Sequence, residues 1–213
     1  MPRRCAVCEA TGLGLCEPCA GALLRIVPPL CDRCGSPGAW PVQRCAECAG
    51  RRLGFARARA AVIYDARAKR LVGAWKDRGR RDLVPVLAGL VVDVVPRPDA
   101  DALAFVPADH DRGLKRGHAP ARALARELGR RWELPVLPLL ARAGRVKPQR
   151  GLRLAERRRN VAGAFEPARA SPRVVCLVDD VYTSGATAAA CATELRHAGA
   201  RRVEVVSFAR AVR

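Results

Sequence analysis

The sequence predicts an α/β domain built on a parallel β-sheet, preceded by a small cysteine-rich domain. Over residues 51–213, apolar strand-like segments alternate with amphipathic helix-like segments, which is typical of parallel sheets connected by helices. The run Val174–Val178 is apolar at every position, as expected of a central strand covered on both faces. Eight of the ten cysteines fall within residues 5–48. We therefore predict two domains, over residues 1–50 and 51–213.

The elements of the second domain can be assigned in order from apolar periodicity and from breaker residues. The expected strands are Arg57–Tyr64, Leu103–Val106, a segment near Val136–Leu140, Val174–Val178 and Val203–Phe208. The expected helices are Ala66–Asp77, one from Asp82 to about Val95, Ala119–Trp132 and Ala186–Ala198. We expect Asp82 to be the N-cap of its helix and Gly199 to end the last one.

Composition limits the class of protein. No segment approaches the length of uncharged apolar sequence that a membrane span needs, and the first residues lack the apolar core of a signal peptide, so we expect a cytoplasmic protein without membrane insertion. The formal charge is +19, and residues 51–213 carry about +18 of it. A polyanion is a plausible partner of this part. Solvated faces and a GC-rich coding sequence, which favours arginine and alanine, account for much of the same excess.

The first fifty residues contain four Cys-x2-Cys pairs, a spacing that lets both sulfurs of a pair reach one metal ion. The pairs are Cys5 and Cys8, Cys16 and Cys19, Cys31 and Cys34, and Cys45 and Cys48. They predict two zinc sites with four thiolates each, most simply grouped in sequence order, although a cross-braced grouping is compatible with the spacing. A disulfide framework is the competing interpretation, and it requires an oxidising compartment.

Four thiolates leave no open position for water, so both zinc ions are expected to be structural. Each zinc–tetrathiolate centre carries two net negative charges, so the first domain changes from +1 without metal to about −3 with metal. A negative domain is poorly suited to bind phosphate. Any nucleic-acid contact is therefore expected in the second domain.

The stretch Val174–Thr187 predicts a site for a ribose phosphate. An apolar strand leads into Asp179 and Asp180, and a loop of small and hydroxylated residues then opens a helix. The loop Thr183–Thr187 (Thr183, Ser184, Gly185, Ala186 and Thr187) can offer backbone N–H groups, hydroxyls and a helix N-terminus to a phosphate, and the carboxylates can accept hydrogen bonds from ribose hydroxyls. A phosphoacceptor receiver domain is disfavoured because its acidic pair lies near the chain start. A P-loop is excluded because G-x4-G-K-[ST] is absent, and a plain structural turn remains the alternative.

This motif resembles the site for 5-phosphoribosyl-1-pyrophosphate (PRPP) of type I phosphoribosyltransferases. With the cysteine pairs in front, the chain resembles the ComF competence-protein family over essentially its whole length. The segments Tyr64–Gly79, Val106–Ala125 and Lys147–Phe165 agree with that family. One segment departs from it, because Arg116-Gly117-His118-Ala119-Pro120 stands where the family usually has Arg-Gly-Phe-Asn-Gln. His118 either replaces a stacking ring or is an exposed loop residue.

The resemblance implies a transferase in which a nitrogen nucleophile displaces pyrophosphate from PRPP, with Mg²⁺ as cofactor and an unidentified acceptor. Asp179 and Asp180 would be the catalytic pair, and residues 183–187 would hold the 5′-phosphate. The candidate contacts to pyrophosphate or to DNA are Arg112, Lys115, Arg116, Lys147, Gln149 and Arg150. The resemblance also implies a link to DNA uptake in natural transformation. Two alternatives are a non-catalytic protein that handles single-stranded DNA and a zinc-ribbon adaptor that docks a competence helicase or another protein.

Overall fold

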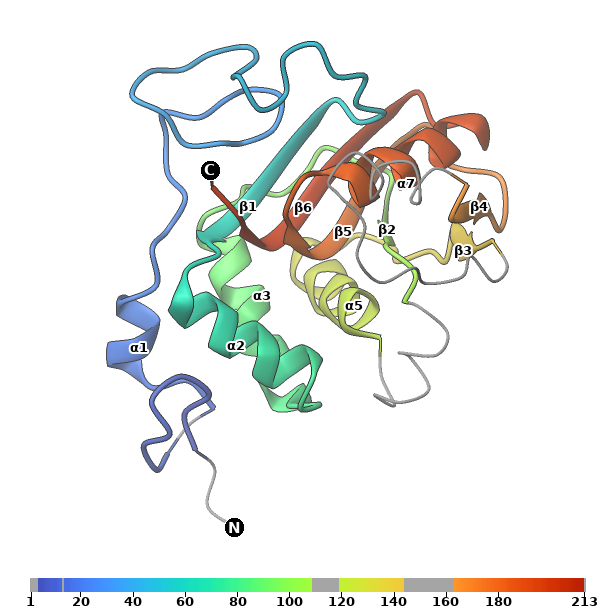
Figure 1. Cartoon of the computed structure of the whole chain (residues 1–213). Helices are drawn as coiled ribbons and strands as arrows, with labels where there is room; N and C mark the ends of the chain where they lie inside the picture. The colour runs from blue at the N-terminus through green and yellow to red at the C-terminus, as the bar shows by residue number, and fades with distance from the viewer. Residues whose placement is uncertain (1–3, 13, 109–118, 144–162, 213) are drawn as a thin grey trace.

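The computed structural model describes residues 4–12, 14–108, 119–143 and 163–212 (Figure 1). The elements in chain order are α1 (Glu17–Gly21), β1 (Arg57–Ile63), α2 (Ala66–Lys76), the 3-10 turn η1 (Arg81–Leu83), α3 (Val84–Val92), β2 (Ala102–Phe105), α5 (Pro120–Trp132), β3 (Leu140–Arg142), β4 (Phe165–Pro167), β5 (Val174–Tyr182), α7 (Ala186–His197) and β6 (Arg202–Arg210). None of the helices in these described ranges is long and apolar enough to cross a membrane.

The main sheet has the strand order β1-β6-β5-β2, and all three pairings are parallel. Strand β5 therefore has a hydrogen-bonded neighbour on each side, with Cys176 opposite Leu103 of β2 and Glu204 of β6. This arrangement confirms the predicted parallel α/β sheet. The carboxyl ends of the strands lie along one edge, which is where ligand sites of such sheets form.

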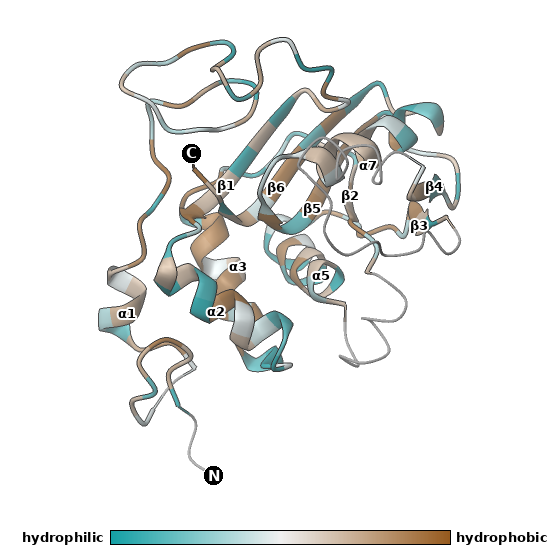
Figure 2. Ribbon diagram, viewed as in Figure 1, coloured by the Kyte–Doolittle hydropathy of each residue, from teal (hydrophilic) through white to brown (hydrophobic). Residues whose placement is uncertain are grey.

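Helices cover both faces of the sheet. Helices α2, α3 and α5 lie on one face and α7 lies on the other (Figure 1). The side chains of β5 alternate between the two cores: Cys176 and Val178 pack with α2, α3 and α5, whereas Val175 and Leu177 pack with α7. All four are fully buried, which is why this strand has an uninterrupted apolar sequence. Figure 2 shows the same apolar lining between the sheet and its helices.

Helix α2 is fixed by a cap and by a buried face. The Oδ1 atom of Asp65 accepts a hydrogen bond from the N–H of Ala68 at 2.8 Å, which satisfies one of the free donors of the first turn. Leu71, Ala74 and Trp75 are buried on its inner side, as the helical period predicts. The helix ends at Lys76, which lies at the carboxyl edge of the sheet beside Asp180.

Two sequence predictions are wrong in detail. The helix expected from Asp82 to Val95 is a 3-10 turn followed by α3, whose N-cap is Leu83. Asp82 instead pairs with Arg80 at 2.7 Å, because the adjacent guanidinium competes for the carboxylate that would otherwise cap the helix. The strand expected near Val136–Leu140 is reduced to a bridge between Val136 and Leu103, and Leu140 starts β3, which pairs with β4 in a separate two-stranded sheet.

The cysteine-rich segment is attached to the α/β domain at several places. The N–H of Ile26 donates to the carbonyl of Ala61 at 2.9 Å, and the N–H of Ala58 donates to the carbonyl of Arg33 at 2.9 Å. These main-chain bonds place the second pair of cysteine knuckles against β1. The domain boundary at residue 50 stays a prediction.

Candidate functional site

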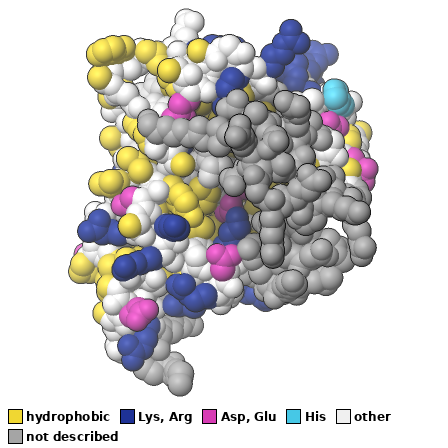
Figure 3. Space-filling model, in the orientation of Figure 1, with side chains coloured by type: hydrophobic (Ala, Val, Ile, Leu, Met, Phe, Trp, Pro, Cys, Tyr) yellow, Lys and Arg dark blue, Asp and Glu magenta, His cyan; other side chains and the backbone are white. Residues whose placement is uncertain are grey.

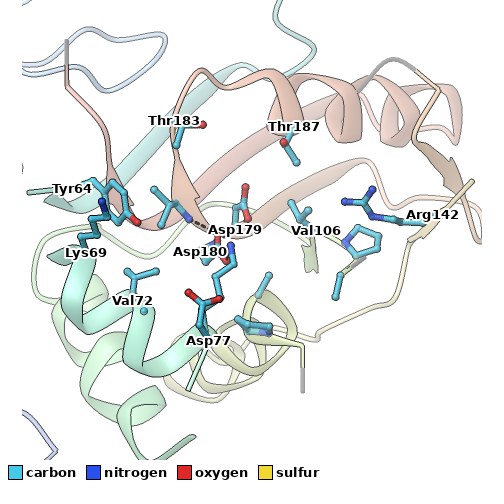
Figure 4. A pocket seen from close by; sticks show the side chains of 17 residues that line it. Tyr64, Lys69, Val72, Asp77, Val106, Arg142, Asp179, Asp180, Thr183 and Thr187 are labelled. Carbon is cyan, nitrogen blue, oxygen red and sulfur yellow. Dashed lines mark hydrogen bonds and ion pairs between the residues drawn. The ribbon is translucent and has the colours of Figure 1, made fainter. Parts of the chain in front are cut away.

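A cavity of about 580 Å³ opens at the carboxyl edge of the sheet (Figure 4). Its walls come from the ends of β2 and β5, the loop after β5, helix α2 and the start of α5. The residues that line it are Tyr64, Lys69, Val72, Gly73, Lys76, Asp77, Val106, Pro107, Ala108, Pro120, Ala121, Arg142, Asp179, Asp180, Val181, Thr183 and Thr187. The acidic pair and the two threonines that the sequence singled out therefore face one space.

Asp179 and Asp180 lie side by side at the end of β5. Asp180 is 8% exposed, and its Oδ1 accepts the N–H of Val181 at 2.8 Å. The Oδ1 of Asp179 accepts the N–H of Asp180 at 2.8 Å. Burial raises the pKa of Asp179 to about 7, and the neighbouring charge of Asp180 acts in the same direction. The site therefore concentrates negative charge that a cation or hydroxyl donors would stabilise.

Helix α2 supplies a cation that the sequence analysis did not name. Lys76 forms an ion pair with Oδ2 of Asp180. Lys69 lies seven residues, or about two helical turns, earlier and lines the same cavity. The signal was present in the sequence as two lysines spaced to share one helix face, but only the fold shows that this face meets the acidic pair. Arg142, at the end of β3, is the third basic residue of the cavity.

The loop between β5 and α7 turns at a glycine and leads into a helix beside the cavity. Gly185 is the N-cap of α7 and has φ 71°, a left-handed conformation that favours glycine. Thr183 and Thr187 line the cavity, as Figure 4 shows, whereas Ser184 accepts the N–H of Ala186 at 3.4 Å through its Oγ. Since α7 begins at Ala186, its N-terminal N–H groups and the positive end of its dipole are available near the cavity.

The remaining candidate contacts lie outside the described residues. They are Arg112, Lys115, Arg116, His118, Lys147, Gln149 and Arg150.

The eight N-terminal cysteines form two clusters, one of Cys5, Cys8, Cys16 and Cys19 and one of Cys31, Cys34, Cys45 and Cys48. In each cluster all sulfurs lie within 4.8 Å of one another. Sequential grouping, and not cross-bracing, is therefore the arrangement in the structure. A tetrahedral zinc site with Zn–S bonds of about 2.3 Å has sulfurs about 3.8 Å apart. The observed distances of 3.7 Å between Cys8 and Cys16 and 3.6 Å between Cys31 and Cys48 fit that geometry.

Backbone N–H groups lower the pKa of one cysteine in each cluster, whereas burial raises the pKa of Cys19, Cys34 and Cys48 in the absence of metal. Burial raises the pKa of the Cys5 thiol, but N–H groups of Cys16 and Cys8 outweigh it and lower the pKa to about 6. In the second cluster burial is likewise outweighed, and the N–H groups of Cys34 and Cys45 lower the pKa of Cys31 to about 7. The residues present therefore fit a structural metal of zinc type in each cluster.

The fold and the site together define the class of protein: a segment with two four-cysteine clusters in front of a parallel α/β domain that has an acidic cavity at the carboxyl edge of its sheet. The chain is homologous to Competence protein F of Haemophilus influenzae, with 29% identity over 210 residues, which are 93% of this chain and 91% of the relative. It is also 29% identical over 206 residues to DNA utilization protein YhgH of Salmonella typhi, covering 90% of this chain and 88% of the relative. These relatives confirm the resemblance to the ComF family.

Two solved structures align with part of the chain. An allosteric regulatory enzyme of purine biosynthesis aligns with a TM-score of 0.43 and 22% identity. The glutamine phosphoribosylpyrophosphate amidotransferase of B. subtilis aligns with a TM-score of 0.39 and 24% identity. Each alignment covers 60% of this chain and 25% of the other. No family model matches the chain.

We predict that metal content follows the two clusters. The purified protein should contain two zinc ions per chain, and Cys8→Ser should lower this to one, because three thiolates and a hydroxyl bind zinc less tightly than four thiolates. Atomic absorption or a colorimetric zinc assay measures the ratio. Cys191→Ala, which removes a cysteine outside both clusters, is the control and should keep two ions; oxidised cysteines without zinc would contradict the prediction.

We also predict that Asp179 destabilises the ligand-free protein as pH rises. Its pKa of about 7 in the folded chain lies above the usual value of an aspartate, so the folded state binds a proton that the unfolded state has lost between about pH 4 and 7. The free energy of unfolding should therefore fall over this range. Asp179→Asn should be more stable than the natural protein at pH 8 and similar to it at pH 4.

Urea denaturation at the two pH values tests this expectation. The control is Glu166→Gln, which neutralises an exposed carboxylate of β4 and should not change the pH dependence. An equal difference between the natural protein and Asp179→Asn at both pH values would contradict it.

Proposed function

We propose that the cavity binds the phosphoribosyl part of PRPP together with Mg²⁺, in a protein that serves the uptake or use of DNA. The observation that carries the proposal is that the acidic pair, Thr183 and Thr187 line one cavity, with the left-handed turn at Gly185 between the two threonines. Among these groups are partners for a phosphate, for ribose hydroxyls and for a cation. The volume of about 580 Å³ falls in the range of small-molecule sites.

Different residues of the cavity would contact different parts of the ligand. The loop Thr183–Thr187 and the start of α7 would hold the 5′-phosphate, because N–H groups and hydroxyls converge there. Asp179 and Asp180 would accept hydrogen bonds from the ribose hydroxyls. Lys69, Lys76 and Arg142 are the cations of the cavity that can face the pyrophosphate.

Carboxylate oxygens are the ligands that Mg²⁺ prefers, so the acidic pair also fits a metal ion, which would neutralise charge on the pyrophosphate. In the transfer that this site supports, pyrophosphate leaves C1 of the ribose and a nitrogen nucleophile takes its place. The acidic pair would stabilise the positive charge that develops at C1.

The link to DNA is supported by the names of the relatives, one a competence protein and the other a DNA utilization protein. Both are matched along most of their length.

We predict that the acidic pair and the loop carry PRPP binding. Asp179→Asn and Thr187→Val should each weaken binding of Mg-PRPP by roughly tenfold or more, because the first replaces a charged acceptor by a neutral amide and the second removes a hydroxyl that can bond the phosphate. Isothermal titration calorimetry with Mg-PRPP measures the affinity. Thr193→Val is the matched control on the same helix, since Thr193 lies outside the cavity and bonds the carbonyl of Ala189 at 2.9 Å.

Equal affinity of natural protein and Asp179→Asn would contradict the assignment of the site. Release of pyrophosphate in the presence of a panel of nitrogen acceptors tests transfer separately from binding. No release with any acceptor, despite tight binding, would oppose the transferase reading and leave the binding proposal standing.

A second candidate function, the handling of single-stranded DNA, is favoured by a basic groove at the opposite end of the sheet. Two adjoining hollows of about 370 and 320 Å³ share Leu53, Gly54 and Arg196. The other residues that line them are Arg33, Arg52, Phe55, Ala56, Thr193, His197, Arg201 and Arg202, and no aspartate or glutamate is among them. Figure 3 shows basic side chains gathered near a histidine at the upper right of the molecule.

Arg52, Arg196 and Arg201 form no ion pair with any residue that the structure describes. Phe55 is buried, so the exposed imidazole of His197 is the one ring among these lining residues that could contact a base. With several guanidinium groups and little exposed aromatic surface, the groove fits a phosphate backbone better than a base-stacking platform.

We predict that Arg196→Ser combined with Arg201→Ser weakens single-stranded DNA binding and its salt dependence. Loss of two phosphate contacts should reduce the slope of log K against log salt by about 1.4 for single strands. Fluorescence anisotropy with a labelled oligonucleotide at several salt concentrations measures this slope. Arg67→Ser combined with Arg126→Ser removes the same charge from exposed positions on α2 and α5 and is the control. An equal loss in both double variants would show that only total charge matters.

A further inference from the structure

Arg210, the last residue of β6, is a buried cation placed between the second cysteine cluster and the loop Thr183–Thr187, called the phosphate loop below. It is 1% exposed. Its NH1 donates to the carbonyl of Cys34 at 2.6 Å, and its NH2 lies 3.5 Å from the sulfur of the same residue. NH2 also pairs with Glu47 at 2.6 Å. All three partners belong to the chain segment that holds the second metal cluster.

A buried guanidinium is costly unless anions and acceptors surround it. Here the carboxylate of Glu47, the carbonyl of Cys34 and the Cys34 sulfur provide that compensation. These groups belong to the segment closed by the four cysteines of the second cluster, and a structural metal is what fixes such a segment in one conformation. The environment of Arg210 therefore depends on the integrity of this cluster.

The other side of Arg210 faces the phosphate loop. Its guanidinium carbon lies 4.6 Å from the centroid of the Tyr182 ring, a cation–π geometry. Tyr182 is buried and directly precedes Thr183, and the ring of Phe55 meets it edge-on with centroids 6.2 Å apart. The Tyr182 ring thus lies between Arg210 and the loop.

The Tyr182 hydroxyl touches the left-handed turn of the loop. A Cβ atom added at Gly185 would collide with this hydroxyl and also with the ring carbons Cζ and Cε2, so the ring itself occupies the space beside the glycine. The position of the ring and the conformation of Gly185 are therefore coupled by contact. Gly185 in turn sets the direction of the N–H groups that open α7.

The first cysteine cluster is attached elsewhere. Arg80 donates from NH1 to the carbonyl of Arg4 at 3.0 Å and pairs with Asp82 at 2.7 Å. Cys5, Val7 and Leu15 pack into the core on the side of α2 and α3. None of these contacts involves the loop Thr183–Thr187. The two clusters thus have the same chemistry but different neighbours.

We propose that Arg210 is a positioning residue of the phosphate loop, acting through Tyr182, and that it makes the order of this loop depend on metal at Cys31, Cys34, Cys45 and Cys48 but not on metal at the first cluster. The consequence for ligand binding rests on the proposed function, namely that the loop holds the phosphate of PRPP. The order of the loop itself does not.

Amide hydrogen exchange of the peptide that covers residues 182–190, followed by mass spectrometry, tests the proposal without any ligand. Arg210→Met and Cys45→Ser should speed exchange of this peptide by roughly tenfold or more, because the stacking contact to Tyr182 is lost. Arg80→Met and Cys8→Ser are the matched controls at the first cluster and should leave it unchanged.

Two variants of Tyr182 separate positioning from a general structural role. Tyr182→Leu removes the ring and should speed exchange of the loop peptide while the zinc content stays at two ions per chain. Tyr182→Phe keeps the ring and should behave like the natural protein. This split would show that the ring orders the loop, and Arg210→Met then tests whether the ring depends on Arg210.

The outcomes are distinct. Unchanged loop exchange in Arg210→Met, or equal acceleration in Arg80→Met and Cys8→Ser, would overturn the proposal. Mg-PRPP titration of the same variants adds the functional arm, with affinity expected to fall roughly tenfold in Arg210→Met and Tyr182→Leu. If the natural protein binds no PRPP while its loop exchange follows the expected pattern, the proposed function fails and the coupling stands.

Discussion

Strand β5 has to satisfy two opposing demands. Its first residues are buried on both faces between β6 and β2, so they are apolar without interruption. Its last residues carry two adjacent carboxylates into a site that is only partly open to water. The neighbouring strands and the helices on each face bury the first residues of β5. Helix α2 brings Lys76 to the carboxylates at the end of the strand. The position of the cavity is therefore set by where this strand ends.

The cost of the acidic pair explains the chemistry of the cavity. Burial raises the pKa of Asp179 to about 7 and the neighbouring charge of Asp180 acts in the same direction, while Lys76 compensates Asp180. A site of this kind is favourable for ligands that bring cations and hydroxyl donors. A ligand that brings such groups would restore the stability that the free protein loses there, a common relation between stability and function.

The two cysteine clusters show how one motif acquires different roles through its surroundings. Both fit a tetrahedral metal, and both are closed by Cys-x2-Cys pairs. The first extends the core next to α2 and α3, whereas the second reaches the carboxyl edge of the sheet, where Arg210 contacts it. Only the second is therefore placed to influence the loop that follows β5.

The sequence by itself determined the features that depend on neighbours along the chain. Short spacing between cysteines predicts the two clusters, an apolar run predicts a central strand, and a hydroxyl-rich loop before a helix predicts an anion cradle. The structure confirms the clusters, the strand and the helix start. It corrects the helix after Asp82 and the strand near Val136, because there the outcome depends on a local ion pair and on which strand accepts the segment.

Only the tertiary structure decided which distant groups meet. Lys76 reaches Asp180 because α2 packs across the sheet edge, and Arg210 reaches Glu47, 163 positions away, because β6 runs parallel to β1 and ends beside the second cluster. The spacing of Lys69 and Lys76 places them on one helix face but does not show what that face meets, and no local pattern marks Arg210, since an arginine in a terminal strand is an ordinary surface position in sequence. Burial and charge compensation between remote segments give both residues their roles.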